Sequence, residues 1–323
     1  MIPVERRLLI KVANMYYIEN MKQSDIAAKL GINRTTVSKY LKRAMDAGLV
    51  KISIVDDSYA YLEAALERKF NLKEVYIVSS NSDSDEVKNN MGKAGLAFLK
   101  RIIAVNKIIG FAWGSSIGAL ARQSALEHCS PASVDFVPLV GGPENIDSEF
   151  HVNTICYKVA QAFSSNSHYL YAPAITKTVE IREAIIQDVN YANIVEYWNN
   201  MDIAFVGIGA PVKSSNLVWA GDFATGAFAK ESIDGLAQSG VVGEICSIFY
   251  DINGLVVKTD FTDKIIAIGL EKLRKLEYSI GIAASKEKVP AIYGALKGQI
   301  INVLISDEDT AKLLLEYEGG AQI

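Results

Sequence analysis

Apolar residues recur every three or four positions near the start of the chain, which is the period of an amphipathic helix. This spacing predicts a first helix over 4–20, carried by Leu8, Leu9, Val12, Ala13, Tyr16 and Tyr17. Ser24 is a favourable N-cap and Asp25 suits a positive first turn, so a short second helix is expected over 25–30. Gly31 then supplies the left-handed backbone conformation that ends a helix and turns the chain.

A third helix is expected over 34–47, capped by Asn33 and ended by Gly48. Its predicted inward face comprises Val37, Tyr40 or Leu41, Ala44 and Met45. Its outward face carries basic and hydroxyl side chains: Arg34, Thr35, Thr36, Ser38, Lys39, Lys42 and Arg43. The alternating segment 49–55 predicts a strand or wing after this helix.

From residue 74 onward, short β-branched runs alternate with amphipathic segments. The runs predict strands over 74–79, 107–113, 134–140, 168–174, 202–209, 278–284 and 301–306. The amphipathic segments predict helices over 86–104, 116–128, 152–163, 178–198, 264–275, 287–297 and 308–317. Because the strands are apolar runs rather than alternations, both faces of the sheet must be covered. The pattern therefore predicts an α/β fold with a largely parallel, doubly wound sheet.

Two further segments do not belong to this alternation. The segment 247–257 predicts an inserted hairpin, with Asn253-Gly254 as its turn. A helix is expected after residue 58, with an apolar stripe along one side: Tyr59, Leu62, Leu66 and Phe70. The simplest interpretation is that the stripe packs on the core, and a dimer helix is the alternative.

Charge divides the chain into two parts. Residues 1–55 hold ten Lys or Arg against four Asp or Glu, although the whole chain of 323 residues has a net charge of −4. A basic head on an acidic body indicates a local anionic partner for the head. We expect the head to span 1–55, a polar hinge to span 56–58 and the body to span 59–323.

Several classes of protein are disfavoured. No stretch approaches the ~20 apolar residues of a membrane helix, and Met1–Arg7 lacks the features of a signal peptide. Neither the P-loop nor the dinucleotide-binding glycine motif is present, and no cofactor is expected. Cys129, Cys156 and Cys246 show no paired spacing, which predicts reduced, buried thiols in a cytoplasmic protein. His128, His151 and His168 show no metal-ligand spacing.

The head resembles the helix-turn-helix of bacterial transcription regulators over 23–44. In such domains the third helix enters the major groove of double-stranded DNA, and its first residues face the base edges. Arg34, Thr35, Thr36 and Ser38 would then read bases, whereas Lys39, Lys42 and Arg43 would contact phosphates. The alternative is a basic helical hairpin that packs on the body. We favour DNA binding because the small residues, caps and charge agree.

Three glycine-containing loops follow predicted strands, where parallel sheets bind ligands. Gly114-Ser115-Ser116 lies between a strand and a helix, where backbone N–H groups and hydroxyls can hold a phosphate. Gly141-Gly142 and Gly207 with Gly209 follow two other strands. Glycine also serves ordinary strand-to-helix turns, which is the alternative for each loop alone.

The chain as a whole resembles the SorC-type sugar-binding transcriptional regulators, and most closely their sorbose- or sorbitol-operon branch. The matching stretches are YYIENMKQSDIAAKLGINRTTVSKYLKRA, IGFAWGSSI, VPLVGGP, HVNT, DIAFVGIG, GVVGEICSIFYDINGLVV and SIGIAASKEKVPAIYGALKGQIINVLISDEDTAKLLL. The resemblance implies a helix-turn-helix head and a Rossmann-like body related to sugar-phosphate isomerases and deaminases. It also implies a homotetramer, a dimer of dimers, that senses a phosphorylated sugar and regulates a carbohydrate operon.

The same resemblance implies an effector site. Gly114, Ser115 and Ser116 would hold the phosphate, Lys288 would lie over it and Glu244 would bind effector hydroxyls. Gly141, Gly142 and Asn153 would line the same pocket.

The chain departs from its relatives in two places. Val140 stands where several relatives have Lys or Arg, and Ala284-Ser285 stands where many have Gly-Gly. The first change argues against a Schiff base or a second phosphate contact there, and the second predicts a different fit around the phosphate. The alternative function is an enzyme of the same body fold, with Glu244 and Lys288 as base and electrophile.

Overall fold

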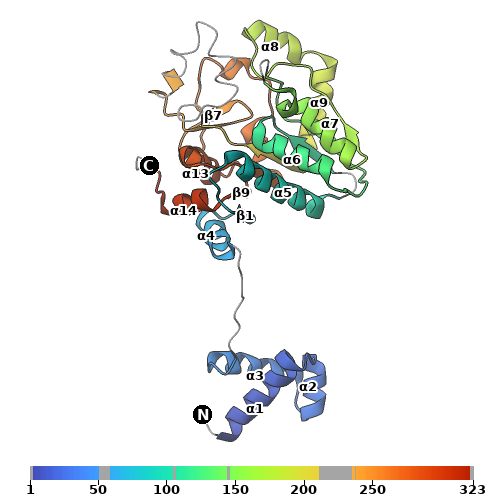
Figure 1. Cartoon of the computed structure of the whole chain (residues 1–323), viewed down its shortest axis with the longest axis vertical. Coiled ribbons are helices and arrows are strands. Elements are labelled where there is room, and N and C mark those ends of the chain that lie inside the picture. The colour runs from blue at the N-terminus through green and yellow to red at the C-terminus, as the bar shows by residue number, and fades with distance from the viewer. Residues whose placement is uncertain are drawn as a thin grey trace. The chain divides into compact units, whose positions relative to one another are not determined.

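The computed structural model describes residues 3–50, 59–104, 107–143, 146–210, 235–236 and 238–320. The chain divides into two units, Met1–Asp57 and Ser58–Ile323. We refer to them as the head and the body (Figure 1). The expected hinge at 56–58, and residues 51–55 of the expected wing, lie outside the described residues.

The head consists of helical segments around one small core. They are α1 (Pro3–Ala13), the π-helical η1 (Asn14–Ile18), α2 (Gln23–Leu30) and α3 (Arg34–Asp46). Its main core cluster comprises Val12, Met15, Ile26, Ala27, Val37 and Leu41. Gly31 adopts the predicted left-handed conformation, with φ +64°, between α2 and α3. Asn33 caps α3 as predicted, and the helix-turn-helix is confirmed.

Two local predictions for the head are wrong. Helix α2 begins at Gln23, so its N-cap is Lys22 and not Ser24. Ser24 lies inside the first turn, where its hydroxyl donates to the carboxylate of Asp25 at 3.2 Å. Met45 is exposed, whereas Leu41 and Ala44 are buried. Met45 follows Leu41 by four residues but lies about 80° around the helix from Val37, so it falls at the edge of the buried stripe.

The body is built on a seven-stranded parallel sheet with the order β1-β9-β8-β5-β2-β3-β4. Its strands are β1 (Glu74–Val78), β2 (Ile108–Phe111), β3 (Asp135–Pro138), β4 (Asn166–Ser167), β5 (Ile203–Gly207), β8 (Tyr278–Ile282) and β9 (Val303–Asp307). Its described helices are α4 (Ala60–Phe70), α5 (Ser84–Ile102), α6 (Ser115–Leu126), α7 (Val152–Ala162), α8 (Val179–Ile186), α9 (Val189–Asn199), α12 (Leu270–Leu273), α13 (Val289–Lys297) and α14 (Glu308–Glu316). The predicted parallel α/β fold is confirmed.

The strand order fixes where the sheet can bind a ligand. If β2, β3, β4, β5, β8 and β9 are numbered 1 to 6 in chain order, their order across the sheet is 3-2-1-4-5-6, which is that of a Rossmann-type sheet. Strands β2 and β5 are neighbours in the sheet. The strand that pairs with β2 on its other side is β3, and the strand that pairs with β5 on its other side is β8, so the chain proceeds in opposite directions from the two. The crevice beyond the carboxyl ends of β2 and β5 is therefore the topological switch point, where such sheets bind ligands.

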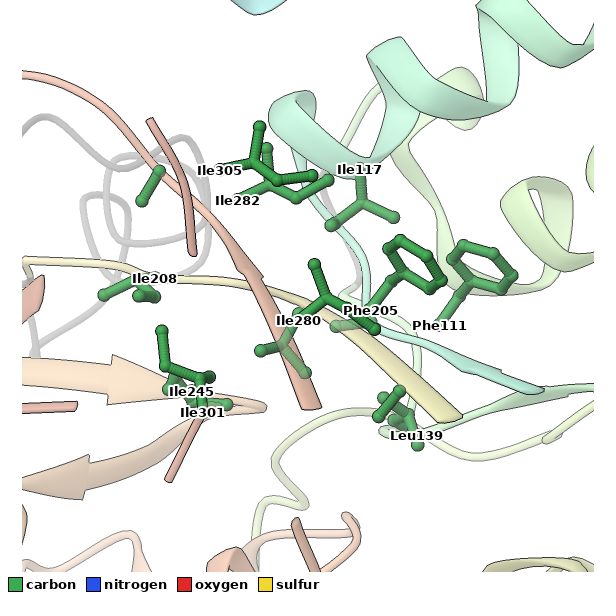
Figure 2. Packing of buried hydrophobic residues seen from close by; sticks show 14 of the residues in the cluster. Phe111, Ile117, Leu139, Phe205, Ile208, Ile245, Ile280, Ile282, Ile301 and Ile305 are labelled. Atoms are coloured by element: carbon green, nitrogen blue, oxygen red, sulfur yellow. The ribbon is translucent and has the colours of Figure 1, made fainter. Parts of the chain in front are cut away.

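Burial on both faces of the sheet explains the apolar runs of the sequence. Helices α5, α6 and α7 lie side by side on one face (Figure 1). At the centre, the rings of Phe111 on β2 and Phe205 on β5 stack with centroids 5.2 Å apart. Figure 2 shows these two rings together with Ile117 and Ile280, which belong to the same buried cluster.

Helix α4 covers the outer edge of the sheet. Edge strand β1 would expose backbone N–H groups, but Glu63 and Glu67 of α4 accept those of Ile77 and Val75, each at 2.9 Å. Leu66 of the same helix is fully buried in the body core, and Tyr59 and Phe70 pack against that core. The prediction that this stripe packs on the core is confirmed for these residues.

The first and last elements of the body meet. Strand β1 pairs with β9, and α4 packs against α14. The ammonium of Lys69 donates to three carbonyls at the end of α14, those of Leu314, Leu315 and Tyr317, at 2.8–3.1 Å. These contacts satisfy carbonyl groups that a helix end leaves without partners.

Three predicted elements of the body differ from the structure. The strand expected over 168–174 is shorter and earlier, at Asn166–Ser167. The helix expected over 178–198 divides into α8 and α9, because Asp188 accepts the N–H of Asn190 and starts a second helix. Only Leu270–Leu273 of the helix expected over 264–275 is α-helical; Ile265 and Ala267 form bridges to extended segments instead.

The predicted hairpin turn at Asn253-Gly254 is present, and a second turn, at Cys246 and Ser247, which the sequence analysis missed, lies just before it. Strands β6 (Gly243–Ile245) and β7 (Ile248–Tyr250) pair around Cys246 and Ser247, which both have positive φ angles. The Asn253-Gly254 turn follows β7 and leads to an isolated bridge between Tyr250 and Val256.

Candidate functional site

The outward face of α3 presents the side chains predicted to contact DNA. Arg34, Thr35, Ser38, Lys39, Lys42 and Arg43 are exposed, and Thr36 is half-buried. The Asn33 side-chain oxygen accepts the hydroxyls of Thr35 and Thr36, at 2.6 and 2.7 Å, and the N–H of Thr36 at 2.8 Å. Both threonines therefore also fix the start of α3, a role that sequence reasoning missed.

The predicted phosphate loop lies at the switch point of the sheet. Gly114 precedes α6 with φ +118°, a conformation that favours glycine, and its N–H donates to the Phe150 carbonyl at 3.1 Å. Ser115, Ser116 and Ile117 form the first turn of α6, whose N–H groups have no partner inside the helix. These donors and the partial positive charge of the helix end form a favourable environment for an anion.

A small cavity of about 50 Å³ brings the main candidates together. Its walls come from the segment after β2 and the start of α6, from the end of β5 and the loop that follows it, and from three residues distant in sequence: Ala112, Trp113, Gly114, Ser115, Ser116, Ile117, Gly207, Ile208, Gly209, Glu244, Cys246 and Lys288. The predicted Gly114–Ser116 loop, Glu244 and Lys288 thus line one cavity.

Glu244 is held by the Cys246–Ser247 turn, which the sequence analysis missed. Glu244 is 5% exposed, and Oε2 of its carboxylate accepts the N–H of Ser247 at 2.9 Å. The backbone groups of Glu244 and Gly209 exchange two hydrogen bonds of 3.0 Å, which fasten β6 to the loop after β5. This anchoring explains how a residue far along the chain reaches the switch point.

Lys288 stands at the start of α13, on another wall of the same cavity. Burial lowers the pKa of its ammonium group, whereas the carboxylate of Glu244 opposes that change. The positive charge of Lys88 lowers the pKa further. A bound anion would offset both the burial and the repulsion.

A second cavity of about 450 Å³ shares the phosphate-loop wall. Both cavities are lined by Trp113, Gly114, Ser115, Ser116 and Lys288. The larger one also includes Ser285, which sequence analysis placed near the phosphate, and polar residues that sequence reasoning missed: Asn81, Ser82, Ser84, Lys88 and Asp307. The polar run 79–86 after the first predicted strand was the available signal.

Three residues predicted to line the pocket do not line either cavity. The N–H groups of Gly141 and Gly142 donate to the carbonyls of Ile266 and Ala172. A Cβ on Gly142 would meet the ring of His151 at 1.9 Å, so close packing requires this glycine. Asn153 exchanges two hydrogen bonds of 3.1 Å with the backbone of Leu170.

The remaining candidates for chemistry have structural positions. Cys129, Cys156 and Cys246 are buried free thiols, as predicted. In the described part of the chain, no group of three His, Cys, Asp or Glu side chains could hold a metal ion. None of the described helices is both long and apolar enough to cross a membrane.

Comparison with known proteins gives consistent matches for both units. Residues 57–316 match the model of a sugar-binding domain family, and residues 14–47 match the model of sigma-70 region 4. The sorbitol operon regulator of Klebsiella pneumoniae is 38% identical over 96% of this chain and 98% of its own length. The chain belongs to the SorC family of sugar-binding transcriptional regulators.

A second relative and a solved structure support this assignment. The deoxyribonucleoside regulator of Bacillus subtilis (strain 168) is 30% identical over 96% of this chain and 98% of its own length. The crystal structure of full-length SorC from Klebsiella pneumoniae matches 97% of this chain and 99% of its own, with a TM-score of 0.74 and 39% identity. This SorC-family chain is a regulator of a sugar operon with a DNA-binding head and a sugar-binding body. Because the named relatives are transcription regulators, the enzymatic alternative is set aside.

Proposed function

We propose that a phosphorylated sugar or sugar alcohol binds at the switch point of the body and controls the affinity of the head for operator DNA. The observation that carries the proposal is the convergence of Ser115, Ser116, Glu244 and Lys288 on one cavity. The first turn of α6 and the Lys288 ammonium favour an anionic group. The buried carboxylate of Glu244 is a strong acceptor for sugar hydroxyls.

The head is proposed to read double-stranded operator DNA through α3. Arg34, Thr35, Thr36 and Ser38 would face base edges, and Lys39, Lys42 and Arg43 would contact phosphates. A cytoplasmic homotetramer, arranged as a dimer of dimers, would present paired heads to two half-sites. The effector needs only to bind the DNA-competent and incompetent arrangements unequally, and a coupling of about 1–3 kcal/mol would change operator occupancy several-fold.

A thermal-shift panel on the full-length chain tests the effector. It would contain phosphates of sorbitol, sorbose and deoxyribose, each beside its unphosphorylated form. Binding adds RT ln(1 + [L]/Kd) to the stability of the folded state, so a micromolar phosphate effector raises the melting midpoint. The double variant Ser115→Ala with Ser116→Ala should remove that rise. Equal shifts from unphosphorylated sugars would refute the phosphate requirement.

Two further measurements test the remaining parts of the proposal. Light scattering coupled to gel filtration should give a mass of four chains. Gel retardation should show that the active phosphate changes binding to the promoter region of the chain's own operon. A protein that ignores this DNA at low salt would contradict the regulatory model.

A further inference from the structure

The larger cavity beside the phosphate loop contains a second lysine. Lys88 lies in the second turn of α5 and lines this cavity together with Ser115, Ser116 and Lys288. It comes from a different element than Lys288, and the two lysines share a cavity with the first turn of α6. Two cations facing one helix N-terminus form an arrangement that an anion would stabilise.

Lys88 forms a weak ion pair with Asp85 in this structure. Its Nζ lies 3.0 Å from Oδ1 of Asp85, one turn earlier on α5. The Asp85 side chain is 80% exposed and that of Lys88 is 34% exposed, so solvent screens the pair and it stabilises little. Asp85 also lies within the influence of Arg122, which remains near it if Lys88 turns away.

A phosphate in the cavity would be a stronger partner. It has three acceptor oxygens and up to two negative charges, and hydrogen bonds between ions are about twice as strong as neutral ones. The cavity also contains the carboxylate of Asp307, but this group accepts the hydroxyl of Ser80 at 3.2 Å and the N–H of Thr310 at 3.1 Å. Asp307 is therefore engaged within the body.

We propose that Lys88 is a second phosphate-binding cation of the effector site, and that it exchanges Asp85 for the phosphate when the effector binds. This inference rests on the proposed phosphorylated effector. It makes α5, as well as α6 and α13, part of the site. It also predicts that Asp85 competes with the phosphate for Lys88.

Because Asp85 and the phosphate would compete for Lys88, substitutions of Lys88 and of Asp85 should change phosphate affinity in opposite directions. In Lys88→Gln a charge-assisted contact is lost, so affinity should fall about ten-fold or more. In Asp85→Asn the competing carboxylate is lost, so affinity should rise roughly two- to five-fold. Lys93→Gln is the matched control, because Lys93 is exposed on the same helix and lines neither cavity.

Isothermal titration of the full-length chain with inorganic phosphate and with sorbitol 6-phosphate measures these effects. The proposal is supported if Lys88→Gln weakens binding, Asp85→Asn strengthens it and Lys93→Gln leaves it unchanged, with equal melting midpoints. An ion pair that merely stabilises α5 would make both variants weaker or leave both unchanged, and either result overturns the proposal.

The failure of this inference can be told from the failure of the proposed function. If Lys88→Gln binds phosphate as well as the wild type while the Ser115/Ser116 double variant does not, only the role of Lys88 is wrong. If the wild-type chain binds neither inorganic phosphate nor sorbitol 6-phosphate, the proposed effector class and the proposed role of Lys88 are both wrong.

Discussion

The carboxylate of Glu67 and the backbone N–H of Val75 form a 2.9 Å hydrogen bond that closes the outer edge of the sheet. Glu67→Ala leaves a buried N–H group without its acceptor, and such a loss costs about 1–3 kcal/mol. We expect a lower midpoint in urea unfolding of the body. Arg68→Ala, an exposed neighbour on α4, is the control. Equal changes in the two variants would show that the hydrogen bond is not responsible.

The cap at Asn33 should determine whether α3 is ordered before DNA arrives. Asn33→Ala removes one oxygen that accepts three donors, and the loss of such a cap costs about 0.5–2 kcal/mol. Asn33→Ser should keep most of this stability, because serine is also a favourable cap. Circular dichroism of the two variants on heating, with DNA affinity measured in parallel, checks the prediction. Identical melting would contradict it.

Ser285 has φ +131°, in a region that only glycine adopts without strain. Ser285→Gly should therefore relieve about 1–3 kcal/mol of strain and lose about 0.5–1 kcal/mol to the greater freedom of the unfolded chain, with a net gain of up to about 2 kcal/mol seen as a higher melting midpoint. Ala284→Gly is the matched control: Ala284 has no positive φ, so glycine there should destabilise by about 0.5–1 kcal/mol. Ser285→Ala keeps the strain and should gain nothing. A lower midpoint for Ser285→Gly would show that the hydroxyl outweighs the strain.

Two substitutions on α3 should separate base reading from phosphate contact. Arg34→Ala should reduce the preference for operator over unrelated DNA by about 1–3 kcal/mol. Lys42→Ala should weaken binding to both DNAs and lower the slope of log affinity against log salt by about 1. Fluorescence anisotropy with two duplexes over a range of salt concentrations measures both effects. If neither variant changes retention of the operator, α3 is not the recognition helix.

Phosphate binding should weaken at alkaline pH, because burial lowers the pKa of Lys288. The ammonium then loses its proton at a lower pH than an exposed lysine, and the uncharged amine no longer attracts phosphate. Without phosphate, rising pH has the opposite effect on the stability of the fold. Lys288 keeps its proton to a higher pH in the unfolded chain than in the folded one, so raising the pH between its folded and unfolded pKa values favours the folded state. Lys288→Arg should keep phosphate affinity in this range. Titrations in buffers of different ionisation enthalpy should show proton uptake on binding.

Local physics explains which elements could be predicted from the sequence. Gly31 and Asn33 act within a few residues of themselves, so their roles in the helix-turn-helix follow from residue type. Apolar runs such as 202–209 reveal strands buried on both faces, because no solvent-facing residue interrupts them. The position of Ser115 and Ser116 at the start of α6 could also be predicted, because a glycine turn before a helix is a local feature.

Long-range contacts explain which features could not be predicted from the sequence. The turn at Cys246–Ser247 depends on the Glu244 carboxylate accepting the Ser247 N–H, whereas Asn253-Gly254 is the stronger turn by residue type. Asn153 binds the backbone of Leu170, seventeen residues away, which no spacing rule indicates. Lys88 lines a cavity together with Ser115 and Ser116 because α5 packs on α6, a contact that residue type alone does not indicate.

The pairing of β1 with β9 also affects how the protein is made on the ribosome. The head has a hydrophobic core of its own and can fold as soon as it emerges. The body cannot close until its final strand has been translated, because β1 and α4 need β9 and α14 as partners. A nascent chain would therefore carry a formed DNA-recognition module before it can sense any metabolite. Premature termination upstream of residue 303 should yield a binder that no sugar can control.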